Sequence, residues 1–562
     1  MASRTFSNNG KYLHIPVYDG DPADFRYIKI ITGGTVRREF SIGIADAAHP
    51  VQFYVPFYLG NYEGDVTFLC EDTGSESFFD GIVPGGEPLE EPSLYPGLYQ
   101  EPERQQIHFS PARGWMNDPN GLFCIDGKYS MCFQHNPYGP YHACTNVSWG
   151  HAVSEDGVHF RECPDAIQPY SSRCHVASGS AIIDETDISG MGKDTVIAAY
   201  TALQSRQYCG RPEQKQNEGQ YLLYSKNGGM SYEYFEHNPI ITVPFGEEWR
   251  DPKILRLDDH TFCIAVYETY EGNNCVSFYT SHDCVNWERV SREKDLFECP
   301  DLFEIPVAET GEMKWVLYGG NGRYRVGDFR DFHFTALPEP DETYLDYGTA
   351  VYAGQTFNCH PDRTCRRHLA WMLDNQRKWN YSPDCPEGGK AWSQSMSLMC
   401  TLTLHKTERG YRLFRAPIRE IYSLRADDTG RPEELRSGMK LRAPCEYKFS
   451  FDDSVPFEML FGSQGFRYDP SSGRVECVMS DDLPSWMTFG ESNRPKLRSY
   501  ELNDDRNHIA DVFVDRRSVE IFIDSEISMS FSFLQEKEVL SLKGTDHFCS
   551  RAYPLASIWR RA

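Results

Sequence analysis

At 562 residues the chain is too long for a single hydrophobic core, so we expect two or three domains. Asp and Glu outnumber Lys and Arg by 82 to 56, which gives a formal net charge of −26. Such an acidic chain repels phosphate backbones and anionic lipid, and no apolar run approaches the roughly 20 residues that span a bilayer, so nucleic acid and membranes are excluded as expected partners.

The N-terminal segment MASRTFSNNGKYLHIP lacks the charged and then apolar pattern of a signal peptide. We therefore expect a cytoplasmic location for the chain as given; secretion would need a signal peptide ahead of it. The 18 cysteines then suit reduced, buried thiols, and no C-x-x-C pair occurs. The one local cluster, Cys359, His360 and Cys365, lacks a second ligand pair, so we expect no metal site.

Residues 1–95 are predicted to form a small accessory β-sandwich. Short runs suited to strands alternate here with Gly, Asp and Pro: YLHIPV, YIKIIT, REFSIGIA, VQFYVPFYL and VTFLC. The segment 85–104, which is rich in Pro and Glu, then indicates a linker or a wrapping segment. We place the first domain boundary there.

Residues 96–430 contain strand-like runs throughout, such as KYSMCFQ, TVIAAYTAL, TFCIAVYETY and KWVLYGG. The segments 154–160, 225–235 and 281–287 each follow a strand, turn tightly and then present an aromatic residue. We interpret them as recurring outer hairpins. Four-stranded units in radial repetition form a β-propeller, and a sandwich with long loops is the alternative that this spacing leaves open.

Residues 431–562 contain a further set of strands, among them CEYKFSF, FEMLFGS, ADVFVD and SVEIFID. This pattern predicts a second sandwich. The expected fold class is therefore all-β over the whole chain.

The segment HFSPARGWMNDPNGLF (108–123) places Asn117 and Asp118 between a Trp and an apolar strand. Asp-Pro and Asn-Gly are common turn formers, so turn chemistry alone favours a tight hairpin with no chemical role. A turn fixed by Pro119 and Gly121 would alternatively present Asp118 rigidly to a cleft.

Two later segments carry further candidate carboxylates. EEWRDPKIL (247–255) sets Arg250 beside Asp251, which by itself could be a surface ion pair and a turn. DLFECPDLFEI (295–305) sets Glu298 within an apolar run, where the alternating pattern could also point it to solvent. In a propeller, acids near the starts of the innermost strands would meet at the axis. Glycosidic cleavage needs two such carboxylates, roughly 5 Å apart when configuration is retained.

Three blocks, WMNDPNG (115–121), WRDP (249–252) and ECP (298–300), resemble the signatures of glycoside hydrolase family 32, which comprises invertases, inulinases, levanases and related fructosyltransferases. FQHNP (133–137), SGSA (178–181) and the block from Asp346 to Phe357 are similar to further family segments. FVDRRSVEIFID (513–524) resembles the signature of the family's sandwich. The resemblance covers about 105–562 and implies a five-bladed catalytic propeller followed by a β-sandwich.

The resemblance also implies roles for individual residues. Asp118 matches the nucleophile, Glu298 the acid/base, and Asp251 the carboxylate that stabilises the transition state, with Arg250 beside the acid/base. Five more positions match residues that hydrogen-bond the terminal fructose or form an apolar wall: Asn117, Gln134, Ser178, Trp115 and Trp371.

Several positions depart from the family's pattern. The Trp expected a few residues after Asn-Pro is absent, and Tyr141 or His142 stands there instead. The usual L-P-R-E-L is replaced by Leu398–Leu402, and Val351 stands where Phe is common. These differences concern the substrate beyond the first fructose unit.

The expected activity is retaining exo-hydrolysis of terminal β-fructosyl units from sucrose or fructo-oligosaccharides, through a covalent intermediate and without a cofactor. A fructosyltransferase would use the same residues, and a non-catalytic fructan-binding propeller would predict loss of an acid. A phosphorylated sugar would need a basic cluster, for which Arg323, Arg325 and Arg330 are candidates. The extra N-terminal domain could extend the acceptor side or mediate homo-oligomerisation.

Overall fold

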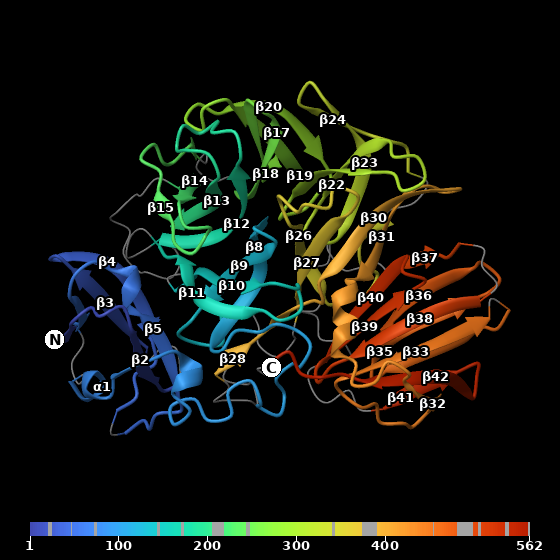
Figure 1. Cartoon of the computed structure of the whole chain (residues 1–562), viewed down its shortest axis with the longest axis horizontal. Helices are drawn as coiled ribbons and strands as arrows, with labels where there is room; N and C mark the ends of the chain where they lie inside the picture. Colours follow the sequence, from blue (N-terminus) through green and yellow to red (C-terminus); the bar gives the residue numbers. More distant parts are fainter. Residues whose placement is uncertain are drawn as a thin grey trace.

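The structure is a computed structural model, and it describes residues 1–20, 25–46, 48–71, 76–142, 146–169, 174–204, 218–242, 248–339, 343–373, 391–452, 454–479, 498–503, 507–533 and 539–559. Within these ranges the strands form nine sheets, which confirms the all-β prediction (Figure 1). None of the helices in them is long and apolar enough to cross a membrane.

Two sheets near the N-terminus enclose a core of their own. Alternate residues of the runs predicted as strands point inward; in β5 (Phe53–Tyr58), Phe53, Val55 and Phe57 are buried. One sheet has the order β1-β6-β3-β4 and the other β5-β2-β7. Their other strands are β1 (Ala2–Phe6), β2 (Tyr12–Val17), β3 (Arg26–Thr32), β4 (Thr35–Ile42), β6 (Val66–Cys70) and β7 (Val83–Gly85), with a short helix α1 (Glu76–Asp80).

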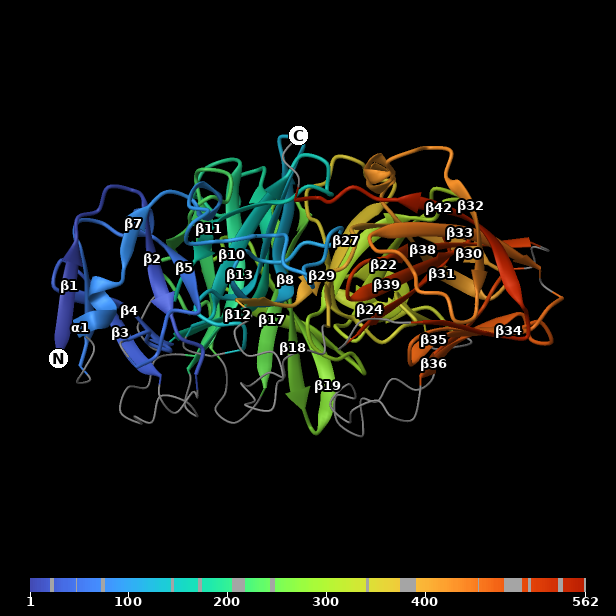
Figure 2. The same ribbon diagram turned by 90° about the horizontal axis from the view of Figure 1, so that it is seen from below.

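Five antiparallel sheets then form the blades of a propeller, as predicted (Figures 1 and 2). Blade I contains β8 (Gly114–Ile125), β9 (Lys128–Asn136), β10 (Ser148–Ser154) and β11 (Arg161–Ile167). Blade II contains β12 (Cys174–Asp184), β13 (Thr195–Gln204), β14 (Gly219–Ser225), β15 (Glu233–Tyr234) and β16 (Ile241–Thr242). Blade III contains β17 (Trp249–Asp258), β18 (Thr261–Tyr270), β19 (Asn273–Ser281) and β20 (Glu288–Lys294).

Blades IV and V complete the ring. Blade IV contains β21 (Asp301–Pro306), β22 (Met313–Tyr318), β23 (Arg323–Arg330), β24 (His333–Ala336) and β25 (Thr343–Tyr344). Blade V contains β26 (Val351–Thr356), β27 (Arg366–Met372), β29 (Ser395–Met396), β30 (Cys400–Thr407) and β31 (Gly410–Pro417). A two-residue strand, β28 (Trp392–Ser393), leaves blade V and pairs in parallel with β8, which ties the last blade to the first.

The three recurring segments are outer hairpins, as predicted. Each joins the third strand of a blade to the fourth, and each begins with a Ser whose hydroxyl bonds an acidic or amide side chain two residues later. In blade I, Asp156 Oδ1 also accepts the backbone N–H groups of Val158 and His159, at 2.9 and 2.8 Å. The repeated polar turn is the local signal that made the blades visible in the sequence.

The last part of the chain forms two facing sheets around the core of Tyr447, Phe449, Met459 and Phe466. Their orders are β32-β42-β33-β38-β39-β40 and β37-β36-β35-β34-β41. The strands are β32 (Arg431–Arg436), β33 (Cys445–Asp452), β34 (Phe457–Phe461), β35 (Gln464–Asp469), β36 (Arg474–Met479), β37 (Ser499–Glu501), β38 (Asn507–Val514), β39 (Ser518–Ile523), β40 (Ile527–Ser532), β41 (Leu540–Lys543) and β42 (His547–Pro554). The division into 1–95, 96–430 and 431–562 stays a prediction.

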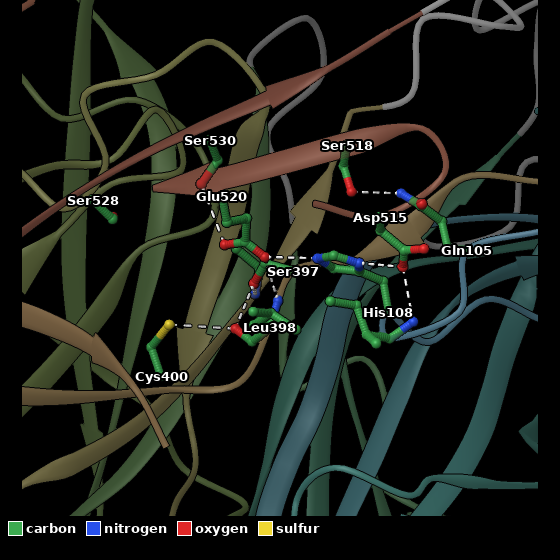
Figure 3. Close-up of polar contacts among 12 residues, drawn as sticks. Gln105, His108, Ser397, Leu398, Cys400, Asp515, Ser518, Glu520, Ser528 and Ser530 are labelled. Atoms are coloured by element: carbon green, nitrogen blue, oxygen red, sulfur yellow. Dashed lines mark hydrogen bonds and ion pairs between the residues drawn. The ribbon is translucent and has the colours of Figure 1, made fainter. Parts of the chain in front are cut away.

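A buried ionic cluster joins the propeller to this second sandwich (Figure 3). His108, which precedes β8, lies 2.8 Å from Asp515 Oδ2 through Nδ1 and 2.9 Å from Glu520 Oε1 through Nε2. The backbone N–H of Ile107 also donates to Asp515, and that of Leu398 donates to Glu520. Both acids come from the segment 513–524 that the sequence analysis singled out, so this segment fixes the strand of Asp118 against the sandwich.

Candidate active site

The three candidate carboxylates lie on or next to innermost strands of three blades. Asp118 is in β8 of blade I, Asp251 is in β17 of blade III, and Glu298 is three residues before β21 of blade IV. Each position is near the start of its strand, so the propeller brings the acids together at one end of the axis, as the sequence analysis expected.

The segment around Asp118 corrects one prediction. Residues 114–125 form a continuous strand, not a turn. Its register against β9 shifts between Met116 and Pro119, so that Asn117 and Asp118 together face the single residue Gln134. This β-bulge re-aims the two side chains, which is the function we had assigned to a turn.

The same irregularity recurs in blades II, III and V. Two residues face one partner at Ala177–Ser178 in β12, at Asp251–Pro252 in β17 and at Ala353–Gly354 in β26. Asp251 and Ala353 have positive φ angles of 63° and 50°, and Glu298 in blade IV has a φ of 48°. Non-glycine residues rarely adopt these angles, so the backbone is strained at these three positions of the site.

Cys299 contacts two of the three acids. Its Sγ lies 3.6 Å from both Asp118 Oδ2 and Asp251 Oδ2, and its backbone N–H donates to Asp251 Oδ2 at 3.1 Å. The pKa of the thiol is raised well above its usual range, first by burial and then by the neighbouring carboxylates. The thiol therefore stays protonated, and its single proton can be donated to either Asp118 or Asp251.

Glu298 is held by two side chains. The Arg250 guanidinium pairs with Oε1, and the Tyr352 hydroxyl donates to Oε2 at 2.5 Å. Arg250 Nε also lies 3.7 Å from Asp251 Oδ2, and the guanidinium packs over the ring of Tyr267. One cation therefore links two of the acids and is itself held by an aromatic face.

The electrostatics of the site favour a proton on Asp118 and Asp251. Burial, and then the charge of Asp251, raises the pKa of Asp118 to about 7, although the hydrogen bond from Ser178 opposes this shift. Burial raises the pKa of Asp251 to about 6, against the lowering effect of Arg250. Carboxyls with such perturbed pKa values in one cluster are typical of catalytic sites.

Buried acceptors without partners border the carboxylates. Among the described residues, Asn117 Oδ1, Asp118 Oδ1 and Gln355 Oε1 are buried and accept no hydrogen bond. Ser178 Oγ donates to Asp118 Oδ2 at 2.7 Å, and Gln134 Nε2 donates to Val176 O at 2.9 Å. Buried acceptors left open in a folded protein are suited to ligand hydroxyls.

The two predicted wall residues, Trp115 and Trp371, are both buried. Trp371 packs edge-to-face with Tyr352, and its indole N–H donates to Gln394 Oε1 at 3.1 Å. Trp115 packs edge-to-face with His142 at 5.0 Å between ring centres. His142, one of the two residues that stand after Asn-Pro in place of a Trp, therefore lies beside Trp115.

Sequence reasoning missed three contributors: Cys299 and Tyr352, which touch the acids, and Gln355, which donates to Gly179 O at 3.3 Å. All three stood inside segments already singled out, so closer reading of those segments could have nominated them. Their contacts depend on bulges and on neighbouring blades, which no local pattern encodes.

The remaining polar candidates lie elsewhere. Arg323 and Arg325 are on β23, the third strand of blade IV; Arg325 pairs with Asp295 at 3.4 Å, and Arg323 donates to the Asp295 carbonyl. His360 Nε2 is 3.2 Å from the Tyr129 hydroxyl, and Cys365 Sγ is 3.2 Å from Asp362 Oδ2. In the described part of the chain, no group of three or more His, Cys, Asp or Glu residues could hold a metal ion.

Comparison with known proteins identifies the family that shares these segments. The model of the glycosyl hydrolases family 32 N-terminal domain matches residues 108–417. A levanase of Bacillus subtilis (strain 168) is 31% identical over 462 residues, which cover 77% of this chain and 60% of the levanase. A levanase of Bacillus sp. (strain L7) is 29% identical over 477 residues, which cover 76% of this chain and 48% of that protein. The chain thus spans about half to three-fifths of the length of these two levanases.

A solved structure has the same fold. The exo-inulinase of Aspergillus awamori superposes with a TM-score of 0.67 at 24% identity, covering 82% of this chain and all of the inulinase. At this identity the likeness concerns the fold, a five-bladed propeller with a β-sandwich.

Proposed function

The chain belongs to glycosyl hydrolase family 32, and from that premise we propose that it is a retaining exo-β-fructosidase. Its substrates would be sucrose or fructo-oligosaccharides, from which it would release terminal β-D-fructofuranosyl units. The observation that carries the proposal is that Asp118, Asp251 and Glu298 lie close together. The Cys299 thiol contacts Asp118 and Asp251, and the Arg250 guanidinium contacts Asp251 and Glu298.

In the proposed first step, Asp118 attacks the anomeric carbon of the terminal fructose while the bond to the leaving oxygen breaks. Glu298 gives its proton to that oxygen, so the leaving sugar departs neutral and Glu298 becomes a carboxylate. In the second step, Glu298 takes a proton from water, and the hydroxide formed displaces Asp118. Both carboxyls return to their starting states, and the configuration is retained because two inversions occur.

The surrounding residues suit these steps. Arg250 and Tyr352 hold both oxygens of Glu298, so its position relative to the leaving oxygen is fixed before substrate enters. Asp251, fixed by the Cys299 N–H, would hold fructose hydroxyls and favour the positively charged transition state. Asn117 and Gln355 offer open acceptors for further hydroxyls.

The product time course from sucrose, a β-2,1 oligofructan and a β-2,6 oligofructan tests the proposal. We expect free fructose to appear one unit at a time. Asp118→Asn should lower kcat by at least about 10³-fold, because no other group replaces the nucleophile. Asp126→Asn is the matched control, since Asp126 is exposed just beyond the same strand and its φ of 49° suits Asn.

Other outcomes would change the assignment. Growth of longer oligosaccharides would make the chain a fructosyltransferase that uses the same covalent intermediate. Fructan binding without turnover by the wild-type chain would leave a non-catalytic propeller. Full activity in Asp118→Asn would overturn the proposed role of Asp118.

A further inference from the structure

A cavity separate from the carboxylates lies where the N-terminal sheets meet blade I. Its volume is about 670 Å³, within the range of small-molecule sites. Strand β5 of the N-terminal sheets lies beside β11, the outermost strand of blade I, in both views (Figures 1 and 2). Residues 558–559 near the C-terminus contribute to the lining. Among the described lining residues is none of the proposed active-site residues.

The N-terminal wall of the cavity is a sheet face with unusual composition. In β5 the side chains of Phe53, Val55 and Phe57 enter the core, so Pro56 and Tyr58 occupy the opposite face. Tyr12 pairs with Tyr58 across the sheet, and their rings are 5.0 Å apart. A sheet with one face on a core normally presents polar residues on the other, whereas this face presents half-buried rings.

The propeller wall supplies polar groups and further rings. Glu162 on β11 accepts hydrogen bonds from the Ala112 N–H at 2.7 Å and the Tyr99 hydroxyl at 3.1 Å, both through Oε2. Its Oε1 accepts none from the described residues. Trp559 stacks flat on Tyr99 with ring centres 4.1 Å apart, which fixes the indole at the junction.

The charge of the cavity favours a neutral ligand. Acidic and basic side chains line it in near-equal numbers, and several are already paired. Lys128 lies 3.4 Å from Glu155, and His135 lies 2.8 Å from Asp165. An anion or a cation would find little net attraction here, but a neutral ligand rich in hydroxyls would find both ring faces and hydrogen-bonding partners.

We propose that this junction cavity is a second carbohydrate site, which binds a short segment of a neutral oligosaccharide. The rings of Tyr12 and Tyr58 would stack on the apolar faces of the sugars, and Glu162 Oε1 would accept a hydroxyl. This inference rests on the proposed function only in taking fructans as the ligand. A second site would hold a long oligosaccharide on the enzyme and so raise its local concentration for the proposed active site.

Calorimetric titration of the full-length Asp118→Asn variant with a β-2,6 and a β-2,1 oligofructan tests the site without turnover. We expect two classes of site for at least one of these oligofructans and one class for sucrose. Adding Tyr58→Ser should weaken only the second class, by roughly tenfold, because a stacking ring is lost. Leu89→Arg, at a rim residue that is 48% exposed, should weaken it without affecting folding.

Tyr27→Ser is the matched control, because Tyr27 lies on β3 of the other N-terminal sheet and is 40% exposed. It should leave both classes unchanged. In the wild-type background, Tyr58→Ser should raise KM for the long oligofructan several-fold and leave KM for sucrose unchanged. Thermal melting checks that each variant is folded.

Two results would overturn the second site: a single class of site for both oligofructans, or a second class that both Tyr58→Ser and Leu89→Arg leave intact. Failure of the proposed function is a separate result. It would appear as a wild-type chain that releases no fructose, whatever the titration of the junction cavity gives.

Discussion

At the scale of single residues, a small set of hydrogen bonds sets the protonation of the carboxylates. Asp118 is proposed to attack as a carboxylate, yet its surroundings raise its pKa to about 7. The Ser178 hydroxyl, 2.7 Å from Oδ2, is the first group that favours the charged form. Ser178 is therefore expected to determine what fraction of Asp118 is ionised, and so able to attack, at neutral pH.

The pH dependence of kcat/KM follows from these shifts. Because a raised pKa leaves Asp118 protonated in acid, activity should increase with pH through an acidic limb near pH 7, in which Asp251 also takes part. In Ser178→Ala the limb should move to higher pH, since the hydrogen bond that lowers the pKa is gone. Ser180→Ala, whose hydroxyl bonds Pro252 O instead, should leave the limb in place. An unmoved limb in Ser178→Ala would contradict this account.

Tyr352 offers a second test at this scale. Tyr352→Phe removes the hydrogen bond to Glu298 Oε2 but keeps the ring that packs on Trp371. We expect kcat/KM to fall by about 10- to 100-fold. General acid–base catalysis accelerates a reaction by about 10²–10⁴-fold, and a misplaced Glu298 would lose part of that acceleration. Tyr224→Phe, which loses a comparable hydrogen bond to Glu233 on blade II, should retain full activity. Equal effects of the two changes would refute the positioning role.

At the scale of elements, the cluster at His108 fixes the start of β8 against the second sandwich. Burial alone would lower the pKa of His108, but hydrogen bonds and charges from Asp515 and Glu520 raise it to about 9. The imidazolium therefore persists at neutral pH between two carboxylates whose own pKa values are lowered despite burial. The strand that carries Asp118 thus depends on an ionic contact with another part of the chain.

His108→Gln should lower the free energy of unfolding by about 3–5 kcal/mol, because the buried Asp515 and Glu520 lose the imidazolium between them, although Glu520 keeps Arg415 at 3.5 Å. The pKa of His108 is raised on folding, so its stabilisation is complete below about pH 6.5 and is lost as pH rises through about 9. The gap in melting temperature between wild type and variant should therefore narrow in alkali. His405→Gln, which breaks a more exposed pair with Glu309, should cost at most about 1 kcal/mol. A gap that widened above pH 9 would contradict the assignment.

At the scale of the whole molecule, the N-terminal sheets are fastened to the propeller by specific buried bonds. Asn146, ahead of β10, accepts the Ser41 N–H through Oδ1 and donates to Ser41 O through Nδ2, both at 2.9 Å. Arg38 donates to the Asn146 carbonyl at 3.0 Å. These contacts hold the two walls of the junction cavity in fixed relation.

Asn146→Ala should destabilise this junction by about 1–3 kcal/mol, because the half-buried Ser41 loses the side chain that bonds both its N–H and its C=O. Calorimetry should show a lower melting temperature. Asn61→Ala removes one long bond, 3.4 Å to Asp165 O, across the same junction and should change little. If both variants melt like the wild type, the N-terminal sheets are held mainly by apolar contact.

The amino-acid sequence by itself determined the all-β class, most strands and the three segments that carry the acids. Alternating side chains, turn residues and short motifs are local features of the sequence, so they can be recognised without knowing which strands pair. The prediction from the sequence was wrong at 117–121, where Asp-Pro and Asn-Gly favour a turn. Pairing with β9 instead draws the segment into a bulged strand.

Only the tertiary structure decided the bulges, the contacts of Cys299 and the junction cavity. A bulge depends on the register of the partner strand, and the Cys299 contacts join three blades far apart in the chain. The rings of Tyr12 and Tyr58 become cavity walls only because β11 lies opposite them. Such features arise from long-range packing, which is fixed once the blades close into a ring and which no stretch of sequence specifies alone.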